Sequence, residues 1–252
     1  MILWIAFQKE WREQWRTSRV LIVAAVLIAF GLTSPLLAKY TPEMMRLLPN
    51  GEAILALIPP PTVADAVVQY VKNISQFGII LALLMSMGAV AQEKDKGTAA
   101  MMLVKPLPRW AFLAAKFAAL ALAFALSLAV AGAGCYYYTL LLFEAMNASH
   151  WVMLNGLMLV FVLVYVALTL LASTLTKSSA AAGGLAFGAL VLLNLPAALP
   201  KVGEYLPGQL TAWGITLMLG QPETYWPALW VSLGLIAAAL IGAWIIFERQ
   251  EL

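Results

Sequence analysis

Six long apolar runs constrain the fold more than any other feature of this sequence. They cover approximately residues 19–38, 74–91, 111–142, 151–175, 180–199 and 226–247. Each is near the roughly 20 residues that an α-helix needs to cross the hydrocarbon core of a bilayer. With 63% hydrophobic and only 11% charged residues, the chain carries more apolar surface than a soluble core can bury. We therefore predict an all-α membrane protein with six transmembrane helices, forming one domain over residues 1–252.

Basic residues divide unequally between the two sides of these helices. Of the 15 Lys and Arg residues, only four fall on one side, namely Lys39, Arg46, Lys72 and Lys201. The others fall on the side that holds the N-terminus, the C-terminus and residues 92–110. Because cytoplasmic loops carry the excess of basic residues, both termini are predicted to be cytoplasmic. The compact size and short loops favour a multi-pass protein of a prokaryotic cytoplasmic membrane.

The first 18 residues have the pattern of an amphipathic helix. Their large aromatic residues recur at helical spacing, and charged side chains, including Arg12, fill the other positions. Such a helix suits the interface of the membrane, in contact with lipid. The alternative is a cytosolic tail. The aromatic residues are Trp4, Phe7, Trp11 and Trp15. The first apolar run is too long for a cleavable signal peptide, so we expect it to remain as the first span.

Two segments on the outer side have some structure of their own. In the outer loop over residues 39–73, Thr62 and Asp65 form a capping box that predicts a short helix leading into the second span. Residues 200–225 are predicted to form an outer hairpin, with an apolar middle at 212–219 that fits a short re-entrant or surface helix. Neither segment is long enough to be a separate domain.

Several classes of function are disfavoured because the sequence lacks the residues or motifs that they need. The predicted spans hold almost no ionisable residue at depth, which argues against a proton- or sodium-driven carrier. A P-loop is excluded because the chain contains no Gly-Lys dipeptide. The lone histidine, His150, and the lone cysteine, Cys135, have no company at metal-ligand spacing. The net charge of +3 is small and dispersed, so we expect no nucleic-acid partner. We predict that the chain is not an enzyme and draws energy for any work from a partner.

Residues 92–110 are the densest charged segment of the chain. Within it, Thr98 can cap a short helix over residues 99–104, and Pro106 ends that helix. A short helix with Met101 and Met102 on its surface is a suitable docking site for a cytosolic protein. The alternative is an ordinary cytoplasmic loop whose basic residues only set the topology.

The same segment resembles the cytoplasmic loop of type-2 ABC exporter permeases. The likeness lies in Glu93-x-x-x-Gly97-Thr98, followed by Leu103-x-x-Pro106-x-x-Arg109. Six spans, an amphipathic N-terminal helix and an outer hairpin between spans five and six are also similar, so the resemblance extends over the chain. One departure is Ala99-Ala100, where many relatives carry a leucine and an acidic residue.

The resemblance implies a pair of permease subunits, identical or related, joined to two cytosolic ABC ATPase subunits. ATP and Mg²⁺ would bind to those ATPase subunits, with no cofactor on this chain. The resemblance assigns ATPase coupling to Glu93, Gly97, Thr98, Met101, Met102, Leu103, Pro106 and Arg109. It places a substrate path along the second and fifth spans, near Phe77, Met85, Asn194 and Leu195.

Three functions remain open at this point. The first is the permease of an ATP-driven exporter, whose apolar spans suit an apolar or amphipathic substrate. The second is an ATP-driven mechanical transmitter that acts on an extracytoplasmic partner without moving cargo. The third is a membrane scaffold with no ATPase.

Overall fold

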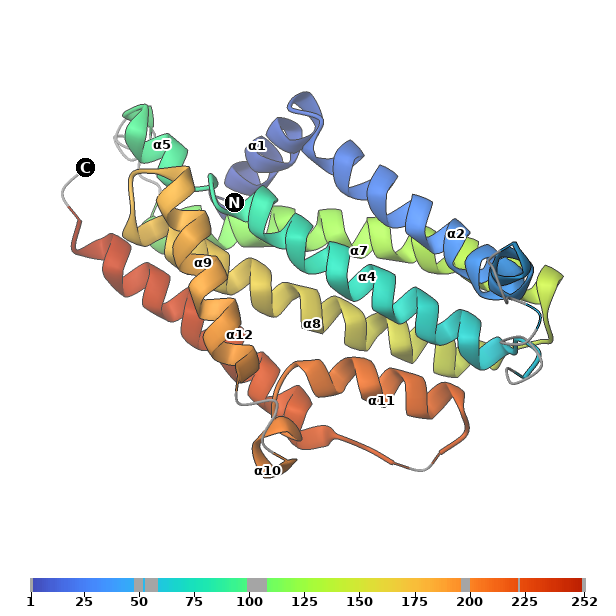
Figure 1. Cartoon of the computed structure of the whole chain (residues 1–252). Coiled ribbons are helices and arrows are strands. Elements are labelled where there is room, and N and C mark those ends of the chain that lie inside the picture. The colour runs from blue at the N-terminus through green and yellow to red at the C-terminus, as the bar shows by residue number, and fades with distance from the viewer. Residues whose placement is uncertain are drawn as a thin grey trace.

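The computed structural model describes residues 2–47, 52, 59–98, 108–195, 200–221 and 223–250, and these residues form a bundle of helices (Figure 1). The helices are α1 (Ile2–Arg16), α2 (Arg19–Arg46), α4 (Val63–Ser86), α5 (Ala91–Asp95), α7 (Arg109–Leu142), α8 (Ala148–Leu175), α9 (Ser179–Asn194), α10 (Pro200–Gly203), α11 (Gly208–Met218) and α12 (Trp226–Glu248).

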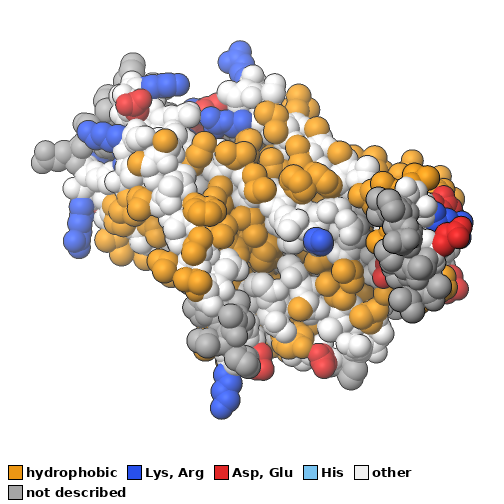
Figure 2. All heavy atoms as spheres, viewed as in Figure 1, with side chains coloured by type: hydrophobic (Ala, Val, Ile, Leu, Met, Phe, Trp, Pro, Cys, Tyr) orange, Lys and Arg blue, Asp and Glu red, His pale blue; other side chains and the backbone are white. Residues whose placement is uncertain are grey.

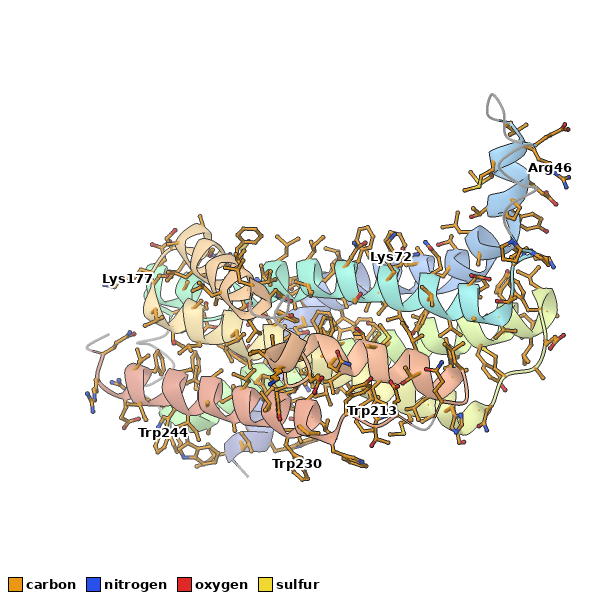
Figure 3. All side chains as sticks on the ribbon, turned by 60° about the horizontal axis from the view of Figure 1, so that its bottom comes forward. Arg46, Lys72, Lys177, Trp213, Trp230 and Trp244 are labelled. Carbon is orange, nitrogen blue, oxygen red and sulfur yellow. The ribbon has the colours of Figure 1, made fainter. Side chains whose placement is uncertain are left out.

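Helix α8 lies at the centre of the bundle. It contacts α4, α7, α9, α11 and α12, whereas α2 packs mainly on α4 and α7. In the most apolar 18-residue stretch of α8, 67% of the residues are buried within the protein, whereas in that of α12 only 17% of the residues are buried. Figure 3 shows Trp230 and Trp244 projecting from α12 away from the bundle, and both side chains are exposed. The periphery is therefore apolar as well as the core, as expected where lipid replaces water.

Within the described residues, five segments are long and apolar enough to cross a membrane, which confirms an all-helical multi-pass architecture. They are α2, α4 together with α5, α7, α8 and α12. The fifth predicted span, 180–199, is represented by α9, which has 16 residues. At 1.5 Å per residue α9 is roughly 24 Å long, shorter than the roughly 30 Å hydrocarbon core. Residues 196–199 lie outside the described part of the chain.

The first two spans differ from the prediction at their outer ends. Helix α2 does not end near residue 38 but continues to Arg46, and it bends away from the bundle toward that end (Figure 3). Pro35 and Pro42 lie inside this helix, and each removes a backbone donor, which explains a bend without a break. The predicted short helix after Thr62 and the second span are one continuous helix, α4. The outer loop is therefore shorter than residues 39–73.

The start of α4 confirms the capping interaction predicted from the sequence. The backbone amide of Thr62 donates a hydrogen bond to the Asp65 carboxylate at 2.7 Å. This bond satisfies a donor that would otherwise lack a partner at the helix N-terminus.

Neutral polar side chains join the helices in the half of the bundle away from the termini. The Tyr70 hydroxyl of α4 donates to the Asn155 side chain of α8 at 2.6 Å, and the Trp151 indole donates to the Gly132 carbonyl of α7 at 3.1 Å. Helices α2 and α7 approach closely at Gly31, where an added Cβ would lie 2.5 Å from the Ala131 carbonyl oxygen. Only glycine permits this backbone approach.

The surface seen in Figure 2 separates by polarity along the bundle. Apolar side chains cover the faces of α2, α4 and α9, whereas many of the charged side chains gather at the two ends or at the lower edge of this view, with a basic side chain near the middle. Both α5 and the start of α9 lie at one of these ends, and α1 lies beside α7 near it (Figure 1).

Candidate functional site

Helix α1 turns a polar face to the protein and an aromatic face outward. The residues that it buries are Ala6, Glu10 and Gln14, one turn apart, and they pack on α7. The adjacent face carries a run of contacting aromatic rings, stacked from Trp4 through Phe7 to Trp11 and edge-to-face between Trp11 and Trp15, whose first and last members are exposed. An exposed aromatic face on a helix of this kind is typical of contact with lipid headgroups. Position in the membrane interface stays a prediction, as does a role for the exposed Arg12.

A buried ion cluster lies beneath α1. The Lys116 side chain of α7 is only 3% exposed, and its ammonium contacts the Glu10 carboxylate at 3.0 Å and the Glu93 carboxylate at 2.7 Å. Three segments far apart in the sequence, α1, α5 and α7, therefore meet at one side chain. The long stem of Lys116 could have carried its charge to the membrane interface. The charge stays inside the protein instead, because two carboxylates compensate for its desolvation.

Lys9 forms a second centre of positive charge in this cluster. Its ammonium lies 2.9 Å from Glu10, 3.1 Å from Glu13 and 3.2 Å from Glu93. Burial alone would lower the pKa of Lys9, but these carboxylates, Glu10 foremost, raise it above its ordinary value. Burial alone would raise the pKa of Glu13, but the nearby Lys9 and Lys116 lower it below its ordinary value. Both groups are therefore charged at neutral pH.

The acidic members of the cluster resemble a metal site in their spacing alone. Ligand oxygens of Glu10, Glu13 and Glu93 lie within 4.8 Å of one another. Within the described residues, the ammonium groups of Lys9 and Lys116 already supply positive charge to these oxygens. The cluster is an ion-pair network joining helices.

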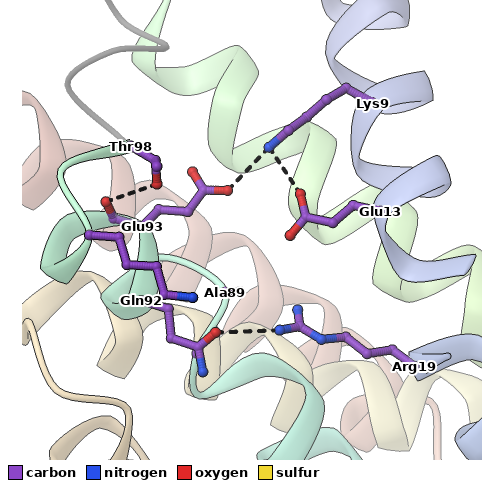
Figure 4. A pocket seen from close by; sticks show the side chains of 9 residues that line it. Lys9, Glu13, Arg19, Ala89, Gln92, Glu93 and Thr98 are labelled. Atoms are coloured by element: carbon purple, nitrogen blue, oxygen red, sulfur yellow. Dashed lines mark hydrogen bonds and ion pairs between the residues drawn. The ribbon is translucent and has the colours of Figure 1, made fainter. Parts of the chain in front are cut away.

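A pocket of about 340 Å³ opens between α1 and α5 beside this network. Figure 4 shows Lys9 bridging Glu13 and Glu93 across it, and Arg19, at the start of α2, approaching Gln92. The Arg19–Gln92 contact is 3.5 Å long. The pocket is thus walled by charged and polar groups from both sides, and its lining includes residues 92, 93, 96 and 98 at the start of the predicted coupling segment.

The C-terminus reaches the same segment from the other side. Lys94 of α5 donates to the Thr174 carbonyl at 2.7 Å and to the Gln250 side chain at 3.1 Å, and Gln250 also donates to the Thr174 carbonyl. Arg109, at the start of α7, donates to backbone carbonyls at the end of α12, including that of Phe247. Both ends of the chain therefore lie at the end of the bundle that carries residues 92–110.

The structure places only part of the predicted coupling set. Glu93 and Arg109 bind other parts of this same chain, as described above. Gly97 has a φ of 67°, in the left-handed region that favours glycine. Thr98 is exposed, and its hydroxyl donates to the Glu93 carbonyl at 3.2 Å. Met101, Met102, Leu103 and Pro106 lie outside the described residues, as does the predicted helix 99–104.

The residues of the predicted substrate path point toward different neighbours. Phe77 stacks on Phe30 of α2, with ring centroids 3.8 Å apart. Met85 is half-buried and lines a small pocket shared with α1 and α7. Asn194 contacts the Tyr165 hydroxyl of α8 at 3.4 Å, and Leu195 is 64% exposed. These contacts describe helix packing for Phe77 and Asn194, and the path stays a prediction.

Sequence reasoning missed several residues of this end of the bundle. Lys9 and Glu10 stood out only as charges between tryptophans, and Ser173, Thr174 and Gln250 had no signal at all. The spacing of Ala6, Glu10 and Gln14 at one side of a helix was the available clue to a buried polar face.

Two comparisons with known proteins agree with this architecture. Residues 4–200 match the family model described as ABC-2 family transporter protein. The chain is also similar to YxlG of Bacillus subtilis (strain 168), named an uncharacterized transmembrane protein, with 25% identity over 257 residues that cover 99% of this chain and 98% of the relative. The family match covers most of the sequence, includes the ion-pair network and accords with the membrane-crossing helices. The chain therefore belongs to the ABC-2 family of transporter proteins, the multi-pass membrane components of ABC transporters, which are not themselves catalytic.

Proposed function

We propose that this protein is the permease subunit of an ATP-driven exporter, with a separate cytosolic ATPase docked on residues 92–110 and on α1. The observation that carries the proposal is the contact of Lys116 with both Glu10 and Glu93. We call residues 92–110 the docking segment. A displacement of its residue Glu93 would act on α1 and α7 together, because the buried Lys116 ammonium of α7 binds both the Glu93 carboxylate and the Glu10 carboxylate of α1. The apolar outer faces of the helices suit an apolar or amphipathic substrate.

Six crossings and cytoplasmic termini are part of the proposal. Helices α8 and α12 end side by side, since Thr174 and Gln250 are hydrogen-bonded. The chain between them must therefore return to the opposite side before α12 begins, and α9 is the segment that starts this return. Most basic residues lie at the end that holds both termini, which favours that end as cytoplasmic.

We also propose that two permease subunits pair in the complex. Gly184 and Gly188 of α9 have open space around the position of a Cβ, so they do not serve close packing within the described part of one subunit. Small residues four apart on a lipid-facing helix allow another helix to approach closely. A second copy or a related permease would fit this face.

The test is affinity purification from native membranes, followed by quantitative and native mass spectrometry. We expect an ATPase with a Walker motif at about one copy per permease and an assembly with two of each. Gly97→Val should release the ATPase, because valine is strained at the left-handed φ of this position. Gly234→Val is the matched control, since its added atoms meet open space on α12 far from the docking segment.

The same preparation separates the alternatives. Recovery of the permease without an ATPase would contradict the proposal. Recovery of an ATPase whose turnover moves no solute in proteoliposomes would contradict export and favour mechanical transmission.

A further inference from the structure

The helix that leads into the docking segment is broken. Helix α4 ends at Ser86 and α5 begins at Ala91. In an unbroken helix, the amides of Val90 and Ala91 would bind the carbonyls of Ser86 and Met87. Instead, the amide of residue 89 binds the Ser86 carbonyl at 3.0 Å. The break therefore leaves two amides and the Met87 carbonyl without their helical partners.

One side chain of α8 takes the place of all three missing partners. The amides of Val90 and Ala91 each donate to the Ser173 hydroxyl oxygen at 3.0 Å. The same hydroxyl donates to the Met87 carbonyl at 2.8 Å. A serine hydroxyl offers one donor and two acceptor sites, so Ser173 uses its full capacity here. Ser173, Val90 and Ala91 are each 0% exposed, and leaving such groups unpaired away from water would be costly.

Two other buried serines of the bundle, Ser127 and Ser232, behave differently. Ser127 and Ser232 each donate to the carbonyl four residues earlier in their own helix. Those hydrogen bonds stay within one helix and do not join it to a neighbouring helix. Ser173 instead reaches across to a backbone segment more than 80 residues away in the sequence, where it completes the hydrogen bonding of the break.

Both sides of the break are held in place by further contacts. Residues 89 and 90 belong to an apolar cluster with Phe112 of α7, Leu170 of α8 and Phe247 of α12. Beyond the break, Lys94 binds the carbonyl of Thr174, the neighbour of Ser173. The end of α8 is therefore the support against which α4 and α5 meet.

We propose that Ser173 is a positioning residue for a hinge at residues 87–90, about which α5 and the docking segment move relative to α4. Two arrangements provide partners for the amides of Val90 and Ala91 and for the Met87 carbonyl. In the bent one, Ser173 binds Val90, Ala91 and Met87. In the straight one, Val90 and Ala91 bind the helical carbonyls of Ser86 and Met87, and the hydroxyl is released. A segment with two such arrangements suits a switch between discrete states. That an ATPase drives the motion rests on the proposed function, whereas the hinge itself is a feature of this chain alone.

The first experiment tests the hinge in the chain itself. The chain is placed in lipid nanodiscs with Cys135→Ala, and spin labels are attached at Leu84→Cys on α4 and Asp95→Cys on α5, both exposed positions. In Ser173→Ala, the label distance should lengthen toward the rise of eleven residues of unbroken helix, roughly 16 Å. Ser173→Thr keeps the hydroxyl and should keep the wild-type distance, as should the matched control Ser127→Ala. An unchanged distance in Ser173→Ala would overturn the proposal.

The second experiment needs no variant of Ser173. The wild-type labelled chain is assembled with its ATPase, and the distance is measured with and without ATP under conditions that prevent hydrolysis. A shift of the distance distribution on ATP binding supports the hinge. ATPase binding with no shift overturns it. Failure of any ATPase to bind would contradict the proposed function instead, and the first experiment would still decide the hinge.

Discussion

The two ends of the helical bundle are joined by different kinds of polar contact. At the end that carries both termini, charged side chains of α1, α5 and α7 meet in a buried network around Lys116. In the half away from the termini, neutral groups do the joining, as in the hydrogen bond from Tyr70 to Asn155 and the one from Asn73 to Ser34. Both sets are buried, and both connect helices that are distant in the sequence.

The difference lies in what happens when one partner moves or is removed. Breaking a buried ion pair leaves an uncompensated charge and typically costs several kcal/mol. Breaking a neutral hydrogen bond between membrane helices averages about 0.6 kcal/mol, because the separated groups find other partners. The neutral contacts thus specify packing, whereas the charged network resists any separate displacement of α1, α5 or α7. This resistance to separate displacement suits a group of helices that must pass on a movement together.

Removing the shared ammonium should have the largest effect. In Lys116→Met, Glu10 and Glu93 both lose a buried partner, and we expect a loss of about 3–5 kcal/mol in the free energy of unfolding. The measurement is equilibrium unfolding by denaturant in mild detergent, followed by circular dichroism. Lys72→Met is the control, because Lys72 is exposed on α4 and should change stability by less than about 0.5 kcal/mol.

A further variant shows whether charge is the cause. Adding Glu10→Gln and Glu93→Gln to Lys116→Met removes the unpaired charges and should restore much of the stability. If Lys116→Met alone is as stable as Lys72→Met, the network does not join the helices as described.

Removing one neutral hydrogen bond in the half away from the termini should reduce stability much less. Tyr70→Phe deletes the hydroxyl that donates to Asn155 and leaves the ring in place, so we expect a loss of about 0.5–1.5 kcal/mol. Tyr137→Phe is the matched control, since that side chain is 59% exposed and should change stability hardly at all. A loss for Tyr70→Phe equal to that of Lys116→Met would remove the contrast between the two ends.

Changing pH should loosen α1 locally without unfolding the bundle. The pKa of Glu13 is lowered in the folded protein, so its contribution is present above the unfolded value of about 4.3 and is lost as the pH falls through the lower folded value. The pKa of Lys9 is raised, so its contribution is complete below about 10.4 and is lost as the pH rises through the higher folded value. The attachment of α1 should therefore be constant from roughly pH 5 to pH 10 and weaken below that window.

Hydrogen exchange of the α1 backbone, corrected for the intrinsic pH dependence, measures this attachment. Glu13→Gln should already have part of the acid effect at neutral pH and respond less to acid. Release of α1 between pH 6 and 8 would contradict the ionisation states described for the network.

Local patterns in the sequence were enough to predict most of the helices. The apolar runs at 111–142, 151–175 and 226–247 agree closely with α7, α8 and α12, because the length of an apolar run is a local property. The end of the first span was wrong for a related reason, because α2 continues past the polar residues around Lys39 to Arg46. The helix predicted after Thr62 does lead into the second span, and Ser34 of α2 satisfies the Asn73 side chain within it.

The candidate site was predictable only in outline. The motif from Glu93 to Arg109 identified the segment, and the spacing of the tryptophans identified α1 as a helix. The partners of Glu93 and Arg109 could not be predicted, because no local pattern joins Lys9 to Glu93 or Arg109 to the end of α12.

The sequence by itself therefore determined that this chain is a helical membrane protein, which end of it is basic, and where its densest charged segment lies along the chain. These properties follow from composition and from periodicities of a few residues. Only the tertiary structure decided that Lys116 is shared by Glu10 and Glu93 and that Ser173 completes the break between α4 and α5. Burial makes those few polar groups dependent on one another, and the choice of partner is made by the packing of whole helices.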